Sequence, residues 1–257
     1  AITETTFGGR EELWPKNPVG GIDYVSLMAL GLQRAKTARE AIRVMTDLVA
    51  RYGYASEGES FSVADPNEAW ILEMIGKGDS AKGAVWFAVR IPDDCISAHA
   101  NQSRIHRFNL KDKKNVMYAR DVISFARSKG YFKGRDDEFS FSDAFAPADF
   151  SSQRFCEARV WSLFNHFTTG MDKYVPFVDG KHIGTSEVMP LYVKPTQLLS
   201  LEDVMSAMRD HYENTPFDGT KDAGSGVWGA PYRPSPLTWE HEGKKYFNER
   251  PVPTHPA

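Results

Sequence analysis

The sequence predicts an α+β protein in which buried strands come first, helices follow, and strands return near the end of the chain. Two observations carry this prediction. Apolar runs of strand length, rich in Val, Ile, Trp and Phe, lie at 69–75, 84–91 and 95–101 and are separated by turn-forming residues. Helical periodicity follows the capping residues Thr37 and Ser200.

The first half of the chain alternates strands and helices. Residues 1–7 have the pattern of a β-strand from the first residue onward. The segment behind Thr37 is a helix with one apolar face, and Gly53 ends it. After the three apolar runs, a second helix is expected at 115–129, where Asn115 can act as the cap.

The second half contains two more helices and a hairpin. The segment behind Ser151 and Ser152 is apolar on nearly all sides, so this helix should be deeply buried. The helix behind Ser200 should face inward through Leu201, Val204, Met205, Met208 and Tyr212. A long Gly- and Pro-rich excursion is predicted at 215–236, followed by a hairpin of 237–242 and 245–250 around Gly243.

Composition limits the classes of protein. The chain has 257 residues, 41% of them hydrophobic, which suffices for a single domain over 1–257. The net charge of −3 and the absence of a basic stripe give no indication of a nucleic-acid partner. No run of residues is apolar for long enough to span a bilayer, and no signal-peptide pattern opens the chain. We expect a soluble protein, and the sequence leaves its cellular compartment undecided.

Common catalytic motifs are missing or lack their context. The G-x-G-x-x-G match at 224–229 is followed at once by prolines, which excludes the helix that a dinucleotide site needs. The seven histidines show no metal-ligand spacing, so we predict no metal and no cofactor. No serine lies in a G-x-S-x-G elbow. Cys95 and Cys156 are expected to be buried free thiols, and His99 a structural histidine.

Two sets of polar residues lie in apolar surroundings. Strand alternation puts Cys95, Ser97, His99 and Asn101 on one face, and such a polar face needs partners or lines a cavity. Arg154 and Arg159 lie on the apolar helix, where a charged guanidinium requires a carboxylate or a carbonyl. An internal pair with Glu157 or Asp149 and a role in a site both remain open at this point.

Several blocks of residues, in order along the chain, carry a resemblance to a known family. They are AITETT (1–6), RAKTARE (34–40), DPNEAW (65–70), VRIPDD (89–94) and ANQ (100–102), with RDHYE (209–213) and NER (248–250) adding to the match. In these blocks the chain resembles the dipeptidase family of N-terminal-nucleophile cysteine hydrolases. The resemblance runs through essentially the whole chain.

The resemblance implies a fold and a mechanism. The fold would be an αββα sandwich, incomplete in this chain. The nucleophile would be a cysteine at the mature N-terminus, with its own α-amino group as the general base. The first residue here is Ala1, and both cysteines are internal. We therefore expect the chain to be an internal part of a larger hydrolase, and to be inactive alone because the nucleophile lies upstream.

The resemblance also implies two site residues. Asn101 is similar to the asparagine that related amidases place beside the nucleophile, and Arg154 resembles their last site arginine. The expected substrates are dipeptides or short peptides, with no nucleic acid and no membrane as partners; association into a homo-oligomer stays open. The alternative is a non-catalytic peptide-binding or interaction module with the same fold. The residue that starts the mature protein would distinguish the two.

Overall fold

A five-stranded antiparallel sheet with the order β1-β2-β3-β4-β6 forms the centre of the chain. The computed structural model describes residues 1–16, 21–79, 81–180, 182–184, 187–218, 220–221, 227–229 and 237–248. In that part of the chain, helices and antiparallel strands are mixed, which confirms the α+β prediction. The sheet strands are Ile2–Gly8 (β1), Gly58–Ala64 (β2), Ala69–Gly76 (β3), Ala84–Ile91 (β4) and Val116–Tyr118 (β6).

The central strand β3 is apolar along its length because both of its faces are covered. Trp70 and Leu72 pack on one side with the residues of α2, and Ile71 and Ile75 pack on the other with β4 and the aromatic residues around Phe145. A strand buried on two faces needs no polar alternation. The continuous apolar run therefore identified this strand correctly.

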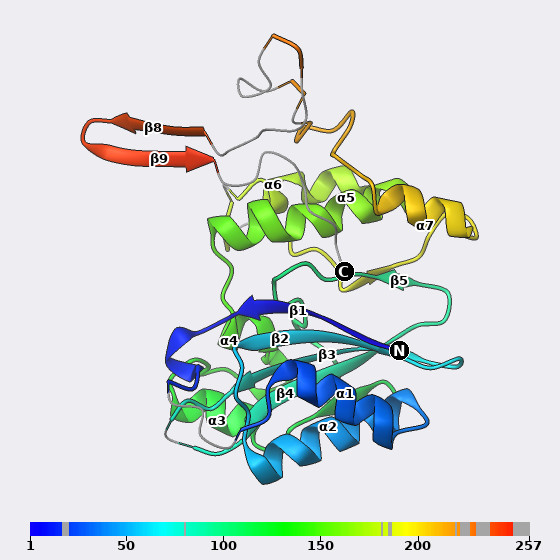
Figure 1. Cartoon of the computed structure of the whole chain (residues 1–257), viewed down its shortest axis with the longest axis vertical. Coiled ribbons are helices and arrows are strands. Elements are labelled where there is room, and N and C mark those ends of the chain that lie inside the picture. The colour runs from blue at the N-terminus through cyan, green and yellow to red at the C-terminus, as the bar shows by residue number, and fades with distance from the viewer. Residues whose placement is uncertain are drawn as a thin grey trace.

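Two helices, α1 (Tyr24–Arg34) and α2 (Ala38–Tyr52), cover one face of the sheet (Figure 1). The start of α2 follows the predicted cap: the Thr37 hydroxyl accepts from the backbone N–H of Glu40 at 3.2 Å. Gly53 ends the helix with a φ of 99°, a conformation that favours glycine. Both ends of this helix were thus predicted from the sequence.

The remaining helices are short, and three of them gather beyond β1. Figure 1 shows α5, α6 and α7 on the side of β1 away from α1 and α2. Among the described residues, no helix has the length and apolar character needed to cross a membrane. These helices are α3 (Val122–Ser128), α4 (Phe141–Phe145), the π-helix η3 (Ser152–Glu157), α5 (Ala158–Phe167), α6 (Val175–Val178) and α7 (Leu201–Ala207), with 3-10 turns η1 (Glu11–Leu13), η2 (Asp136–Glu138) and η4 (Met171–Tyr174).

Two further ladders have two strands each. β5 (Ile96–Ser97) pairs with β7 (Tyr192–Val193), and β8 (Leu237–His241) pairs with β9 (Lys244–Asn248). The second ladder is the predicted hairpin, with Gly243 at a φ of 74° in its turn. Of the predicted excursion at 215–236, residues 219, 222–226 and 230–236 lie outside the described residues, and so does the first half of the glycine motif at 224–229.

Three predicted elements differ in the structure. The expected helix at 115–129 is the strand β6 followed by α3, because Val116–Tyr118 pair with the edge of β4. The expected strand at 95–101 pairs only over β5 and then turns away. The helix α7 was expected to face inward, but Leu201 and Val204 are 71% and 45% exposed. Amphipathic spacing alone does not say that a neighbour covers the apolar face.

Candidate functional site

Asn101 lies in the loop beyond β5, and its side chain bridges two layers of the fold. Its Nδ2 donates to the carbonyl of Thr6 on β1 at 2.7 Å, and its Oδ1 accepts from Nη2 of Arg159 on α5 at 2.9 Å. Its backbone has a φ of 65°, a left-handed conformation that asparagine tolerates better than most residues. The two partners, one acceptor and one donor, fix the orientation of the amide.

Arg159 is the residue that holds this loop in place. The same Nη2 donates to the carbonyl of Ala100 at 2.7 Å, and its Nε donates to the carbonyl of Phe155 at 2.8 Å. The residue is only 4% exposed. A buried guanidinium needs such acceptors to offset its desolvation. Arg159 therefore couples the backbone and the side chain of the Asn101 loop to helix α5.

Arg154 has a different environment from Arg159. Its guanidinium carbon lies 4.4 Å from the ring centroid of Phe217 and 6.0 Å from that of Tyr212, in the range of cation–π contacts. It belongs to the π-helix η3, a rare backbone form that is frequent at functional sites. The structure thus brings Arg159 to Asn101, and places Arg154 against aromatic rings.

The carboxylates considered as partners of Arg154 have other bonds. Glu157 accepts from Nε of Arg104 at 2.9 and 3.1 Å. Asp149 accepts from the backbone N–H of Ser152 at 2.7 Å at the start of the π-helix. Arg104 also donates to three backbone carbonyls, of Ala98, Pro190 and Leu191. The buried pair Arg104–Glu157 thus supports the loop that carries Asn101 from beneath.

A second buried carboxylate fixes the same loop at its far end. Glu73 on β3 is fully buried, and it accepts from the hydroxyl of Ser103 and the backbone N–H of Arg104, each at 2.5 Å. It also accepts from the backbone N–H of Ile105 at 3.2 Å. Burial raises the pKa of this carboxyl, while the three donors act in the opposite direction. Glu73, the one charged residue of β3, thus fixes the backbone segment 103–105.

His99 has the structural role that was predicted for it. Its Nδ1 is 2.6 Å from the hydroxyl of Thr5, and its Nε2 is 2.8 Å from that of Ser62. Burial lowers the pKa of the imidazole to about 3, so the ring is neutral near pH 7. Both ring nitrogens have partners, and the ring joins the loop before Asn101 to β1 and β2.

A cavity of about 420 Å³ opens beside Asn101. Its volume falls in the range of small-molecule pockets. The wall combines basic, acidic and sulfur-containing groups, so it can meet both charges of a zwitterion. The residues that line it include Arg10, Glu12, Asn101, Gln102, Asp149 and Cys156.

The surroundings of Cys95 are not those of an activated thiol. Cys95 is half-buried and donates to the Asp94 carboxylate at 3.6 Å, and burial together with that charge raises the pKa of its thiol. Cys156 is buried and unbridged. A raised pKa disfavours the thiolate, which is the nucleophilic form. The prediction of two buried free thiols is confirmed for Cys156; Cys95 is free as predicted but only half-buried.

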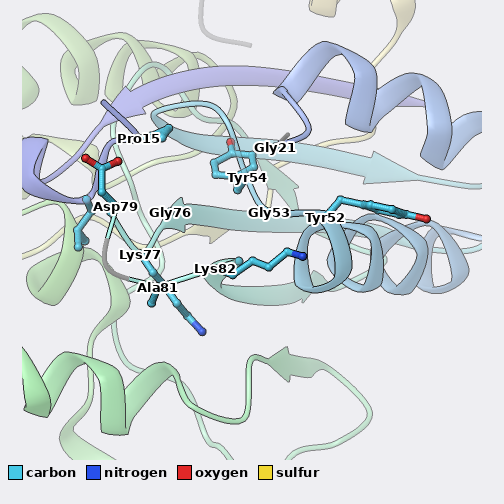
Figure 2. Close-up of a pocket in the computed structure, with 13 residues that line it drawn as sticks. Pro15, Gly21, Tyr52, Gly53, Tyr54, Gly76, Lys77, Asp79, Ala81 and Lys82 are labelled. Carbon is cyan, nitrogen blue, oxygen red and sulfur yellow. The ribbon is translucent and has the colours of Figure 1, made fainter. Parts of the chain in front are cut away.

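Another cavity, of about 670 Å³, lies away from Asn101 at the end of β3. Figure 2 shows Lys77 and Lys82 at its rim and the glycine-rich turn around Gly76 in its wall. Lys77 forms an ion pair with Asp121 at 2.5 Å. The hydroxyl of Tyr54 points away from both ammonium groups. The described residues that line this cavity do not combine an acid–base pair with a nucleophile. In the same part of the chain, no group of three His, Cys, Asp or Glu side chains could hold a metal.

Comparison with known proteins agrees on one family. The family model described as "Peptidase family C69" matches residues 1–244. A protein of Salmonella dublin named "Probable dipeptidase" is 29% identical over 220 residues, which cover 85% of this chain and 47% of that protein. Dipeptidase A of Lactobacillus helveticus is 27% identical over 219 residues, 84% of this chain and 42% of the relative. The chain thus spans less than half the length of these relatives.

Proposed function

Because the chain belongs to peptidase family C69, we propose that the complete enzyme hydrolyses dipeptides and that Asn101 is part of its active site. One observation carries the second half of this proposal. Asn101 is held between Thr6 and Arg159 beside a cavity of about 420 Å³. An amide nitrogen has two hydrogens, and the carbonyl of Thr6 takes one of them. The other is available to a developing oxyanion.

The proposed fold of the complete enzyme is an αββα sandwich, with residues 1–257 as part of a single domain. The five-stranded sheet would be one of its two central sheets, with α1 and α2 as one outer layer. Asn101 and Arg159 would then lie between the sheet and the next layer. The contact from β1 to α5 through Asn101 supports this arrangement.

The proposed nucleophile is an N-terminal cysteine that is not among the residues of this chain. The support is chemical: the thiol of Cys95 has a raised pKa, and Cys156 is buried. An N-terminal cysteine brings its own base, since an α-amine titrates at about 7.7–8.0 and accepts a proton near neutral pH. Attack on the peptide carbonyl would give an acyl-enzyme, and water would then release it.

The test uses both cysteines and a panel of dipeptides. The complete enzyme should release free amino acids, and Cys95→Ala and Cys156→Ala should each leave that rate within about twofold, because neither thiol acts as the nucleophile. The 257-residue chain alone should release none. Turnover by this chain that disappears in either variant would contradict the proposal. A mature N-terminal residue other than cysteine, with no turnover by the complete protein, would favour a non-catalytic peptide-binding module.

A second prediction concerns Arg159, the arginine that contacts Asn101. In the complete enzyme, Arg159→Met should lower kcat/KM by about tenfold to a hundredfold, because Asn101 loses its fixed orientation. The effect should be non-additive with Asn101→Ala, since both changes remove one unit. Steady-state kinetics on the single and double variants measure this. Full additivity would show that Arg159 acts independently of Asn101.

Arg154 is proposed to bind the carboxylate of the substrate. Lysine keeps the charge but loses the planar fork, so Arg154→Lys should retain part of the activity and Arg154→Met should lose more of it, mainly through KM. Both variants should fold, as judged by their melting temperatures. Arg120→Met is the control, because Arg120 is exposed. Normal turnover in both Arg154 variants would leave this residue with a structural role.

A further inference from the structure

The segment 210–218, which follows α7, packs its aromatic rings against Arg154. The guanidinium carbon lies 4.4 Å from the ring centroid of Phe217, and the rings of Phe217 and Tyr212 meet edge-on with centroids 5.8 Å apart. Phe217 also packs edge-on against Trp161 of α5, at 5.4 Å. A cation–π contact requires the cation to lie within about 6 Å of the ring centroid. The position of the Arg154 guanidinium therefore depends on where this segment lies.

The backbone of the segment is strained. Tyr212 and Asn214 have φ values of 65° and 60°, in the left-handed region that residues other than glycine seldom adopt. Such a backbone persists only where surrounding contacts hold it. Two contacts lie within the segment: the Thr215 hydroxyl donates to the carbonyl of Tyr212 at 2.7 Å, and Asp218 accepts from the N–H of Asn214 at 3.1 Å. These two bonds shape the segment but do not attach it to the rest of the fold.

Asp210 attaches the segment to α5. Its Oδ2 accepts from the hydroxyl of Ser162 at 2.5 Å, and its Oδ1 lies 3.1 Å from Nε2 of His166. Oδ1 also accepts from the backbone N–H of Tyr212 at 3.0 Å. The side chain of Asp210 is only 9% exposed, and the end of α7, just before it, lies beside α5 (Figure 1). One buried carboxylate thus bonds both to α5 and to the backbone of the strained tyrosine.

The contact between Asp210 and His166 is an ion pair only over part of the pH range. The hydrogen bond to Asp210 raises the pKa of the His166 imidazole, and the charges of Asp210 and Glu213 add to this against the effect of burial. Glu213 itself lies 3.2 Å from Nδ1 of His211. Burial alone would raise the pKa of Asp210, but the hydrogen bonds from His166 and Ser162 lower it.

The sign of the pH dependence follows from these two shifts. The stability that His166 contributes is fully present below the ordinary histidine pKa of about 6.5 and is lost as the pH rises through the raised value. The contribution of Asp210 is present above about pH 4 and is lost as the pH falls through the lowered value. The ion pair is therefore complete between about pH 4 and pH 6.5. The side chain of His166 is 47% exposed, so its ring exchanges protons with water directly.

We propose that Asp210 is a positioning residue for Arg154, because it fastens to α5 the segment whose rings hold the guanidinium. The inference rests on the proposed function, in which Arg154 binds the carboxylate of the substrate. When His166 loses its proton, the segment is held less firmly, and Arg154 is less often in place to bind the carboxylate. The expected signature is a KM that rises with pH above about 6.5, with little change in kcat from this step.

The test measures kcat and KM of the complete enzyme for Ala-Ala between about pH 5.5 and pH 7.5, the range in which a histidine titrates. Asp210→Asn keeps the shape of the side chain but removes its charge. KM should rise roughly threefold to tenfold at about pH 6, with kcat nearly unchanged, because a charge-assisted hydrogen bond is lost. His166→Gln should raise KM similarly and remove its dependence on pH over this range.

His182→Gln is the matched control. The His182 side chain is 54% exposed and its Nδ1 lies 3.6 Å from a carboxylate oxygen of Asp179, so the pair resembles that of His166 and Asp210. The change should leave KM and its pH dependence within about twofold of the unmodified enzyme.

Two further measurements distinguish positioning from a general loss of stability. In the Arg154→Met background, Asp210→Asn should alter KM by less than about twofold, since both changes act on one unit. NMR of the histidine side chains should show His166 titrating at lower pH in Asp210→Asn than in the unmodified enzyme, because its anionic partner is gone. A lower melting temperature with an unchanged KM would mean that Asp210 only stabilises the fold.

The remaining outcomes also decide the inference. An unchanged KM in a folded Asp210→Asn variant, or an equal rise of KM with and without Arg154, would overturn it. If Asp210→Asn fails to fold, His166→Gln decides in its place, because the half-exposed ring of His166 is not part of the core. There, a KM that keeps its pH dependence would overturn the inference.

Failure of this inference is distinct from failure of the proposed function. A complete enzyme that cleaves Ala-Ala with the same KM in all these variants remains a dipeptide hydrolase, but Asp210 does not position Arg154. A complete enzyme that releases no amino acids from any dipeptide contradicts the proposed function, and the inference fails with it because Arg154 then has no substrate to bind.

Discussion

Asn101→Ala is expected to lower kcat/KM of the complete enzyme for dipeptides by roughly 10²–10³-fold, the usual cost of removing one oxyanion donor. The change deletes the amide that lies between Thr6 and Arg159. Because the backbone has a φ of 65°, alanine also introduces local strain. Asn101→Gly removes the amide without that strain, so it should lose similar activity with a smaller loss of stability.

Asn67→Ala is the matched control, because Asn67 lies exposed in the turn between β2 and β3. Its turnover should equal that of the unmodified enzyme. Steady-state kinetics and thermal unfolding of Asn101→Ala, Asn101→Gly and Asn67→Ala distinguish an active-site role of Asn101 from a purely structural one. A stability loss in Asn101→Gly with nearly normal kcat/KM would make this residue a structural amide of the core.

Arg104→Met is expected to give the largest loss of folding stability, about 3–5 kcal/mol, because it leaves a buried carboxylate without its cation. Arg104 and Glu157 have side chains that are 1% and 5% exposed. The change also removes donors from the carbonyls of Ala98, Pro190 and Leu191. Urea unfolding, followed by tryptophan fluorescence, measures the free energy of unfolding.

Two further variants test the reason for this loss. The double variant Arg104→Met, Glu157→Met should be more stable than Arg104→Met alone, since it removes the uncompensated charge. Arg135→Met is the control: the Arg135–Asp137 pair has side chains that are 74% and 69% exposed, and no measurable change is expected. An equal loss in the single and double variants would mean that the lost carbonyl contacts dominate.

The strands and the best-capped helix could be predicted from the sequence because their local patterns are strong. β3 and β4 are continuous apolar runs, and Thr37 and Gly53 mark both ends of α2. The prediction of a single helix at 115–129 was wrong for a physical reason. The strand β6 has only three residues, and its pairing with β4 is a long-range contact. Local periodicity contains no information on such an edge strand.

The candidate site was only partly accessible to sequence reasoning. Asn101 was singled out, but the choice between Arg154 and Arg159 depends on the π-helix, which changes the angular position of successive side chains.

The way in which β1 joins the sheet has a consequence for the order of folding. Strands β2, β3 and β4 are consecutive antiparallel neighbours, so closing each hairpin costs little chain entropy. β1 pairs with β2 across a long helical insertion, with Ile2 opposite Val63. Thr6, Asn101 and Arg159 meet only after three distant segments have docked. The meander should therefore form early and the candidate site late, which makes the site the most sensitive reporter of complete folding.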